Sequence, residues 1–106
     1  MEVRVKNADR NLLLKFSGEL DHHHTQKLRE EIDRSVLKER PGRLVLDFGG
    51  VEFMDSSGIG LVLGRYRLMQ ELEGRLTLQA MPPHIRRVMR VAGIANLEID
   101  EEESRI

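Results

Sequence analysis

A short apolar run in the middle of the chain, Leu-Val-Leu-Asp-Phe at residues 44–48, constrains the fold more than any other feature. Turn residues precede and follow it, which is typical of a strand buried on both faces of a sheet. Segments with helical periodicity lie before and after it, at about 24–38 and 57–73. Because such helices cover the faces of a parallel sheet, the run predicts the central strand of an α/β fold.

The rest of the chain continues this alternation. Alternating apolar residues at 3–5 and an apolar segment at 12–16 are separated by turn residues, which predicts an N-terminal antiparallel hairpin that Gly18 ends. A third helix is expected at about 82–92, and short strands are expected at 76–78 and 97–99. We therefore expect one α/β domain over residues 1–106 in the order ββαβαβαβ, with a mixed sheet of four to five strands covered by three to four helices.

The acidic C-terminal tail, about residues 98–106, is expected to be a solvated end, and its start is also a candidate for a short final helix.

Composition limits the functions open to the chain. It has 106 residues and no cysteine, which excludes disulfides, thiolate zinc sites, iron–sulfur clusters and thiol nucleophiles. No apolar run approaches the roughly 20 residues of a membrane-spanning helix, and the N-terminus has no signal-peptide core, so we expect a cytoplasmic protein without membrane contact. The 17 basic and 18 acidic residues are balanced and only 4% of residues are aromatic, which argues against direct nucleic-acid binding.

The segment Phe-Met-Asp-Ser-Ser-Gly-Ile-Gly at residues 53–60 lies between the buried strand and a helix start. One Asp or Ser there needs no further function, because its side chain accepts the free N–H groups of the first helical turn. If Asp55 or Ser57 caps the helix, Ser56 faces solvent at the positive end of the helix dipole, where a phosphate is tolerated. Two glycines in this segment leave room for the backbone of a partner, Gly58 and Gly60. On the residues alone, a plain cap and a modification or binding site are both open.

Catalytic and metal-binding alternatives are weaker. The G-x-S-x-G elbow of hydrolases is absent, since Met54 and Asp55 occupy the positions of its glycine and spacer before Ser56. Three consecutive histidines at 22–24 precede the first helix, but adjacent residues rarely aim at one ion, and the helical H-x-x-x-H spacing is missing. We expect a solvated loop and helix cap at the histidines, no enzymatic activity, no cofactor and no metal site.

Three motifs together resemble the anti-sigma factor antagonists of the STAS domain family, and most of all their sporulation branch, the anti-sigma F factor antagonists. These motifs are Gly-Glu-Leu-Asp-His-His at 18–23, the segment at 53–60, and Leu-Gly-Arg-Tyr at 63–66. The resemblance covers nearly the whole chain and implies the STAS fold. It also implies a non-enzymatic protein that works by partner switching. In that scheme the unphosphorylated protein binds an anti-sigma factor, itself an ATP-dependent serine kinase, and so releases the sigma factor that directs sporulation transcription.

The same resemblance implies the site residues. The kinase, with its bound ADP or ATP, would phosphorylate the first serine of Asp-Ser-Ser-Gly, which matches Ser56, and a serine phosphatase of the PP2C type would reverse this. The implied partner-binding residues are Asp21, His22, His23, Met54, Asp55, Ser56, Ser57, Gly58, Ile59 and Gly60.

Two departures from the family pattern matter. The family has threonine where this chain has His24, so another residue is expected to cap the first helix. The C-terminus is also short and leaves little for the family's final helix. A second function stays open on these grounds, namely a STAS scaffold subunit of a larger signalling assembly regulated by phosphorylation.

Overall fold

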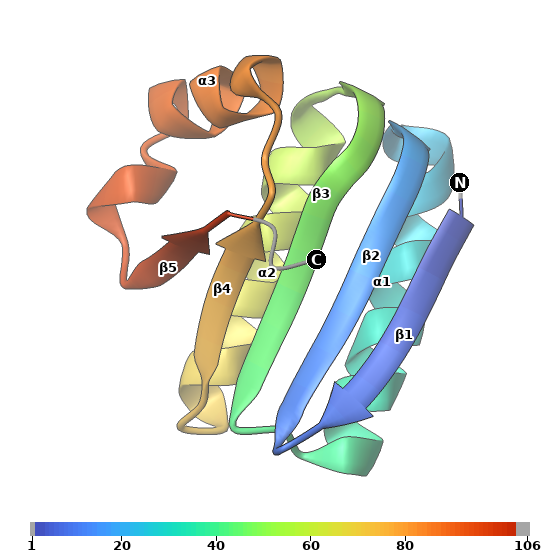
Figure 1. The fold of residues 1–106 in the computed structure, drawn as a ribbon, viewed down its shortest axis with the longest axis vertical. Helices are drawn as coiled ribbons and strands as arrows, with labels where there is room; N and C mark the ends of the chain where they lie inside the picture. Colours follow the sequence, from blue (N-terminus) through green and yellow to red (C-terminus); the bar gives the residue numbers. More distant parts are fainter. Residues whose placement is uncertain (1, 104–106) are drawn as a thin grey trace.

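The computed structural model describes residues 2–103, which form a single sheet with helices packed against it (Figure 1). The elements follow one another as β1 (Glu2–Ala8), β2 (Asn11–Leu20), α1 (His22–Glu39), β3 (Arg43–Met54), α2 (Ser56–Glu71), β4 (Arg75–Gln79), α3 (Pro83–Val91), the 3-10 turn η1 (Ile94–Asn96) and β5 (Ile99–Glu102). The predicted order ββαβαβαβ is therefore confirmed.

The strand order in the sheet is the order of the sequence, β1-β2-β3-β4-β5. β1 pairs with β2 in antiparallel fashion, which confirms the predicted hairpin, and β2 to β5 run parallel to one another. α1 and α2 cover one face of this mixed sheet (Figure 1). Because the strands that precede the helices are parallel, the starts of α1, α2 and α3 lie toward the same end of the sheet (Figure 1).

The core lies between the sheet and its two long helices. Phe16 of β2 and Phe48 of β3 are fully buried, with ring centroids 5.5 Å apart in an edge-to-face arrangement. From α1, the residues buried against them recur at helical spacing: Leu28, Ile32 and Val36. The apolar residues whose spacing predicted this helix are thus the residues that it buries.

Two strands continue past the glycines at which the sequence predicted them to end. β2 runs on through Gly18, which adopts a φ of 101°, and β3 runs on through Gly49 and Gly50. A Cβ on Gly50 would lie 2.8 Å from the carbonyl oxygen of Phe16, so the missing side chain is what lets the strands approach. Register shifts in this pairing keep both strands in the sheet as far as the candidate site.

The last strand, predicted at 97–99, lies at Ile99–Glu102 and so extends into the acidic residues that were expected to be a solvated tail or the start of a helix. β5 pairs with β4, and ion pairs join it to β3 and β4: Arg43 Nη1 to Glu102 Oε1 at 3.2 Å, and Arg75 Nη2 to Asp100 Oδ2 at 3.1 Å. An edge strand tolerates these charges because one side of it stays in water. Residues 104–106 of the predicted tail lie outside the described residues.

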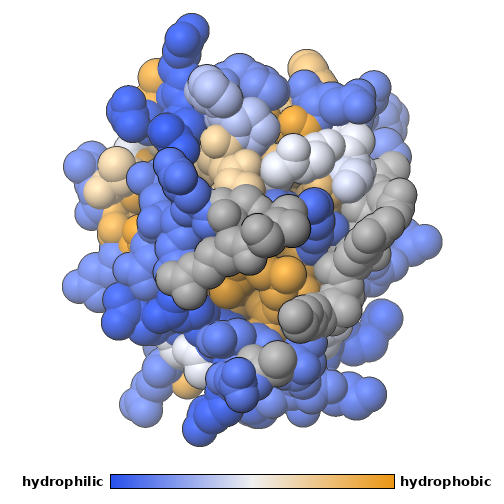
Figure 2. All heavy atoms as spheres, in the orientation of Figure 1, coloured by the Kyte–Doolittle hydropathy of each residue, from blue (hydrophilic) through white to orange (hydrophobic). Residues whose placement is uncertain are grey.

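On the face of the sheet opposite α1 and α2, hydrophobic side chains are visible near the centre and hydrophilic side chains predominate at the rim (Figure 2). Within the described residues, no helix has the length and apolar character needed to cross a membrane.

Candidate functional site

The two sequence motifs meet at the carboxyl ends of β2 and β3. Leu20 pairs with Met54 in the parallel register, and the Asp55 N–H donates to the Leu20 carbonyl oxygen at 3.3 Å. α1 begins at His22 and α2 begins at Ser56, directly after these strand ends. The motifs at 18–23 and 53–60 therefore form one surface, at the N-termini of two neighbouring helices.

The Asp55 carboxylate accepts hydrogen bonds from the first turns of both helices, α1 and α2. Its backbone is extended, its Oδ1 accepts from the Ser57 N–H at 2.8 Å, and its Oδ2 accepts from the His22 N–H at 3.2 Å. The sequence left Asp55 and Ser57 open as the cap of α2, and the cap is Asp55. Desolvation by its neighbours acts to raise the pKa of Asp55, but the bonds from Ser57 and His22 outweigh it and hold the pKa below its usual value.

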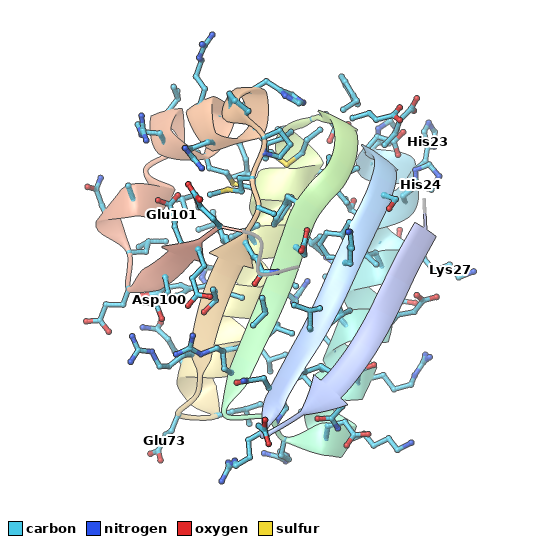
Figure 3. The ribbon with its side chains drawn as sticks, in the orientation of Figure 1. His23, His24, Lys27, Glu73, Asp100 and Glu101 are labelled. Atoms are coloured by element: carbon cyan, nitrogen blue, oxygen red, sulfur yellow. The ribbon has the colours of Figure 1, made fainter. Side chains whose placement is uncertain are left out.

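The sequence predicted that a residue other than the one at position 24 caps the first helix, and this residue is Asp21. Its Oδ1 accepts from the N–H groups of His23 at 3.0 Å and of His24 at 3.2 Å, and lies 2.7 Å from His24 Nδ1. These bonds outweigh desolvation and lower the pKa of Asp21. The prediction of a loop was wrong for His22 and His23, because the Asp21 cap starts α1 at His22 and not near His24 as expected. All three histidines lie in the first turn of α1, where Figure 3 shows His23 and His24.

Ser56 is exposed as the first residue of α2, and its hydroxyl has no hydrogen-bond partner among residues 2–103. Ser57 and Ile59 beside it are half-buried, and Gly60 is exposed. Met54 and Gly58 are buried instead, so they support the surface from below and do not present a side chain to a partner. A Cβ on Gly58 would lie 2.3 Å from Met54 Cγ, which explains why this position is glycine.

Several surface residues near the site were not singled out from the sequence. Phe53, next to the motif's aspartate and serines, is 51% exposed. Between α1 and α2 lies a hollow of about 340 Å³ whose lining residues are Thr25, Gln26, Arg29, Ser57, Gly60 and Leu61. The helical spacing of the α1 residues is visible in the sequence, but which side of α1 turns toward α2 depends on how the two helices pack.

This arrangement suits covalent modification of a serine hydroxyl and docking of a partner protein. A serine hydroxyl stands free in solvent at the positive end of a helix dipole, and the capping role that would otherwise occupy it belongs to Asp55. Among residues 2–103 no group of three His, Asp or Glu side chains is placed to hold a metal ion.

Comparisons with known proteins agree with this fold. The family model described as "STAS domain" matches residues 2–104. The anti-sigma F factor antagonist of Lysinibacillus sphaericus is 33% identical over 94 residues, and that of Paenibacillus polymyxa is 30% identical over 94 residues. Each of these alignments covers 89% of this chain and 80% of the relative.

Among solved structures, the anti-sigma factor antagonist SpoIIAA in its unphosphorylated form superimposes with a TM-score of 0.82 at 30% identity, covering 94% of this chain and 87% of that one. The Bacillus cell fate determinant SpoIIAA in its phosphorylated form gives a TM-score of 0.75 at 30% identity, covering 94% of this chain and 90% of that one. The chain therefore belongs to the STAS domain family and, within it, to the anti-sigma factor antagonists.

Proposed function

We propose that this protein is a non-enzymatic anti-sigma factor antagonist whose binding to its anti-sigma factor is switched off by phosphorylation of Ser56. The observation that carries the proposal is the free Ser56 hydroxyl at the start of α2, on the surface that joins the starts of α1 and α2. Two relatives named as anti-sigma F factor antagonists support it, as does a solved relative described as phosphorylated.

The charge of a phosphate suits such a switch. Phosphorylation adds about −1.5 to −2 charges, and a helix N-terminus offsets about 0.3–2 kcal/mol of the cost, so an exposed Ser56 carries the group without unfolding. Burying the same charge unpaired in an interface costs several kcal/mol, and each roughly 1.4 kcal/mol is a tenfold loss of affinity. A loss of binding of about 10³-fold is therefore within reach of the charge alone.

The partners in this proposal are an anti-sigma factor that is also a serine kinase, with its bound ADP or ATP, and a serine phosphatase of the PP2C type. The unphosphorylated protein binds the kinase and releases a sigma factor, in the sporulation branch of the family. The surface for the kinase includes Asp21, His22 and His23 of α1 and the exposed part of residues 53–60.

The test is phosphorylation by the anti-sigma kinase of the same organism with ATP, followed by mass spectrometry with site mapping. We expect one phosphate on Ser56 of the wild type and none on Ser56→Ala. Ser57→Ala is the matched control and should still be phosphorylated. Phosphate on Ser57 or Ser35, or no phosphate, would contradict the proposal, and a discrete large oligomer of the pure protein would favour a scaffold.

A further inference from the structure

The hollow between α1 and α2 is open because of a glycine that the fold does not require. It lies one turn into both helices, next to Ser57, and has a volume of about 340 Å³. A Cβ on Gly60 would meet no atom within 4 Å, although glycine weakens a helix relative to alanine. Packing therefore explains Gly58 in this helix but does not explain Gly60.

The wall of the hollow carries excess positive charge. Arg29 of α1 is exposed and makes no ion pair with any residue from 2 to 103. Farther along the same pair of helices, the Arg65 side chain is only 6% exposed, and its Nε lies 2.8 Å from Asp33 Oδ1. Arg65 Nη1 is buried and finds no hydrogen-bond acceptor among the described residues. Arg65 is thus paired with Asp33, whereas Arg29 has no carboxylate partner among these residues.

Arg29 acts on Arg65 in the free protein. Burial is the main cause that lowers the pKa of Arg65, Asp33 opposes this, and repulsion from Arg29 adds to the lowering. A negative group that entered the hollow would attract Arg29 and offset this repulsion. A carboxylate in the hollow would therefore face Arg29, which lines it and has no competing ion pair among the described residues.

We propose that the hollow receives an aspartate or glutamate side chain of the anti-sigma factor, and that Arg29 is the residue that binds it. The proposal rests on the function proposed above and adds a partner chemistry and a binding residue to it. A guanidinium holds a carboxylate through paired N–H bonds, and an exposed Arg29 has its donors free for this. The hydroxyls of Thr25 and Ser57 line the same hollow and offer further hydrogen bonds.

The place of the hollow also connects it with the switch. Ser57, which lines it, follows Ser56 directly in the first turn of α2. A phosphate on Ser56 would bring negative charge beside the incoming carboxylate, and like charges repel. Phosphorylation would thus oppose the contact that Arg29 favours.

The test measures the affinity of the anti-sigma kinase of the same organism for the unphosphorylated protein by isothermal titration calorimetry. Arg29→Glu should weaken binding about tenfold or more, and Arg29→Lys, which keeps the charge, should stay within about threefold of the wild type. Arg34→Glu is the matched control, because Arg34 is an exposed arginine of α1 that does not line the hollow. The melting temperature of Arg29→Glu should be no lower than that of the wild type, because the substitution removes the repulsion between Arg29 and Arg65.

A second variant tests the hollow without changing charge. Gly60→Leu fills the space from α2 and should also weaken binding about tenfold. Wild-type affinity in both Arg29→Glu and Gly60→Leu, or equal weakening by Arg29→Glu and Arg34→Glu, would overturn this inference and leave the proposed function standing. Failure of the wild type to bind the kinase at all would overturn both.

Discussion

Asp55, and not the neighbouring Ser56, caps α2. Its carboxylate accepts from the first turn of α2 and also from the first turn of α1, at 2.8 Å and 3.2 Å. Ser56 is left without a capping role, so its hydroxyl can be modified while the bonds that begin both helices stay intact. The structural role thus belongs to Asp55, and the regulated role proposed above belongs to the adjacent Ser56.

The lowered pKa values of Asp55 and Asp21 predict a pH dependence of stability. A carboxyl whose pKa is lower in the folded state stabilises the fold above its unfolded pKa, and this contribution is lost as pH falls through the folded value. Thermal unfolding of the wild type and Asp55→Asn between pH 7 and pH 2.5 should show the variant melting lower at pH 5–7. The difference should begin to narrow below about pH 4, where the carboxyl of the unfolded chain becomes protonated, and should close as pH falls through the lower folded-state pKa of Asp55. A constant difference across this range would contradict a role for the Asp55 charge.

At the scale of the elements, α1 and α2 are joined by the ion pair of Asp33 with the buried Arg65. Because Asp33 is about one-third exposed, its removal should cost less than the roughly 3–5 kcal/mol of a fully buried pair. We expect Asp33→Ala to lower the free energy of unfolding by about 2 kcal/mol in urea denaturation. Asp33→Ala combined with Arg65→Met should recover much of this loss, and an unchanged single variant would show that Arg65 finds another partner.

The glycines of α2 should respond differently to the same substitution. Gly60→Ala should raise the free energy of unfolding by about 1 kcal/mol, because helix propensity improves and the added Cβ meets nothing within 4 Å. Gly58→Ala should bring no net gain, since its Cβ would press on Met54 at a cost of about 1–3 kcal/mol. Chemical denaturation of both variants checks this, and equal stabilisation would mean that Met54 moves aside freely.

The existence and order of the helices and strands could be predicted from periodicity, because each element buries one regular face. Their ends could not, since these depend on contacts with distant segments. Gly18 and Gly50 are typical of strand ends, but Gly50 lies within β3, where a Cβ would clash with the neighbouring strand. The helical start at His22 depends on carboxylates from Asp21 and Asp55, and the second of these is 33 positions away in the chain.

The candidate site also has one part that the local sequence predicts and one part that depends on contacts between distant segments. Capping chemistry predicted that Ser56 would face solvent, whereas the hollow beside Arg29 depends on how α1 and α2 rotate toward each other, which no local pattern encodes.

At the scale of the whole molecule, the site is built on a rigid platform of paired strands. Since the Ser56 side chain makes no hydrogen bond within residues 2–103, a phosphate there disturbs no packing. We expect amide chemical-shift changes on phosphorylation to be confined to about residues 20–26 and 52–61, in proton–nitrogen NMR spectra of the two forms. Widespread changes across β4 and β5 would show instead that the modification alters the fold.

The agreement between strand order and sequence order bears on how the chain folds during synthesis. Each new strand pairs with the one made just before it, so no strand has to insert between two that are already joined. A chain that leaves the ribosome N-terminus first can therefore extend the sheet one strand at a time, and each step after the first hairpin closes a single helical connection. The last strand to arrive is β5, whose acidic side chains discourage pairing of the finished edge with another nascent chain.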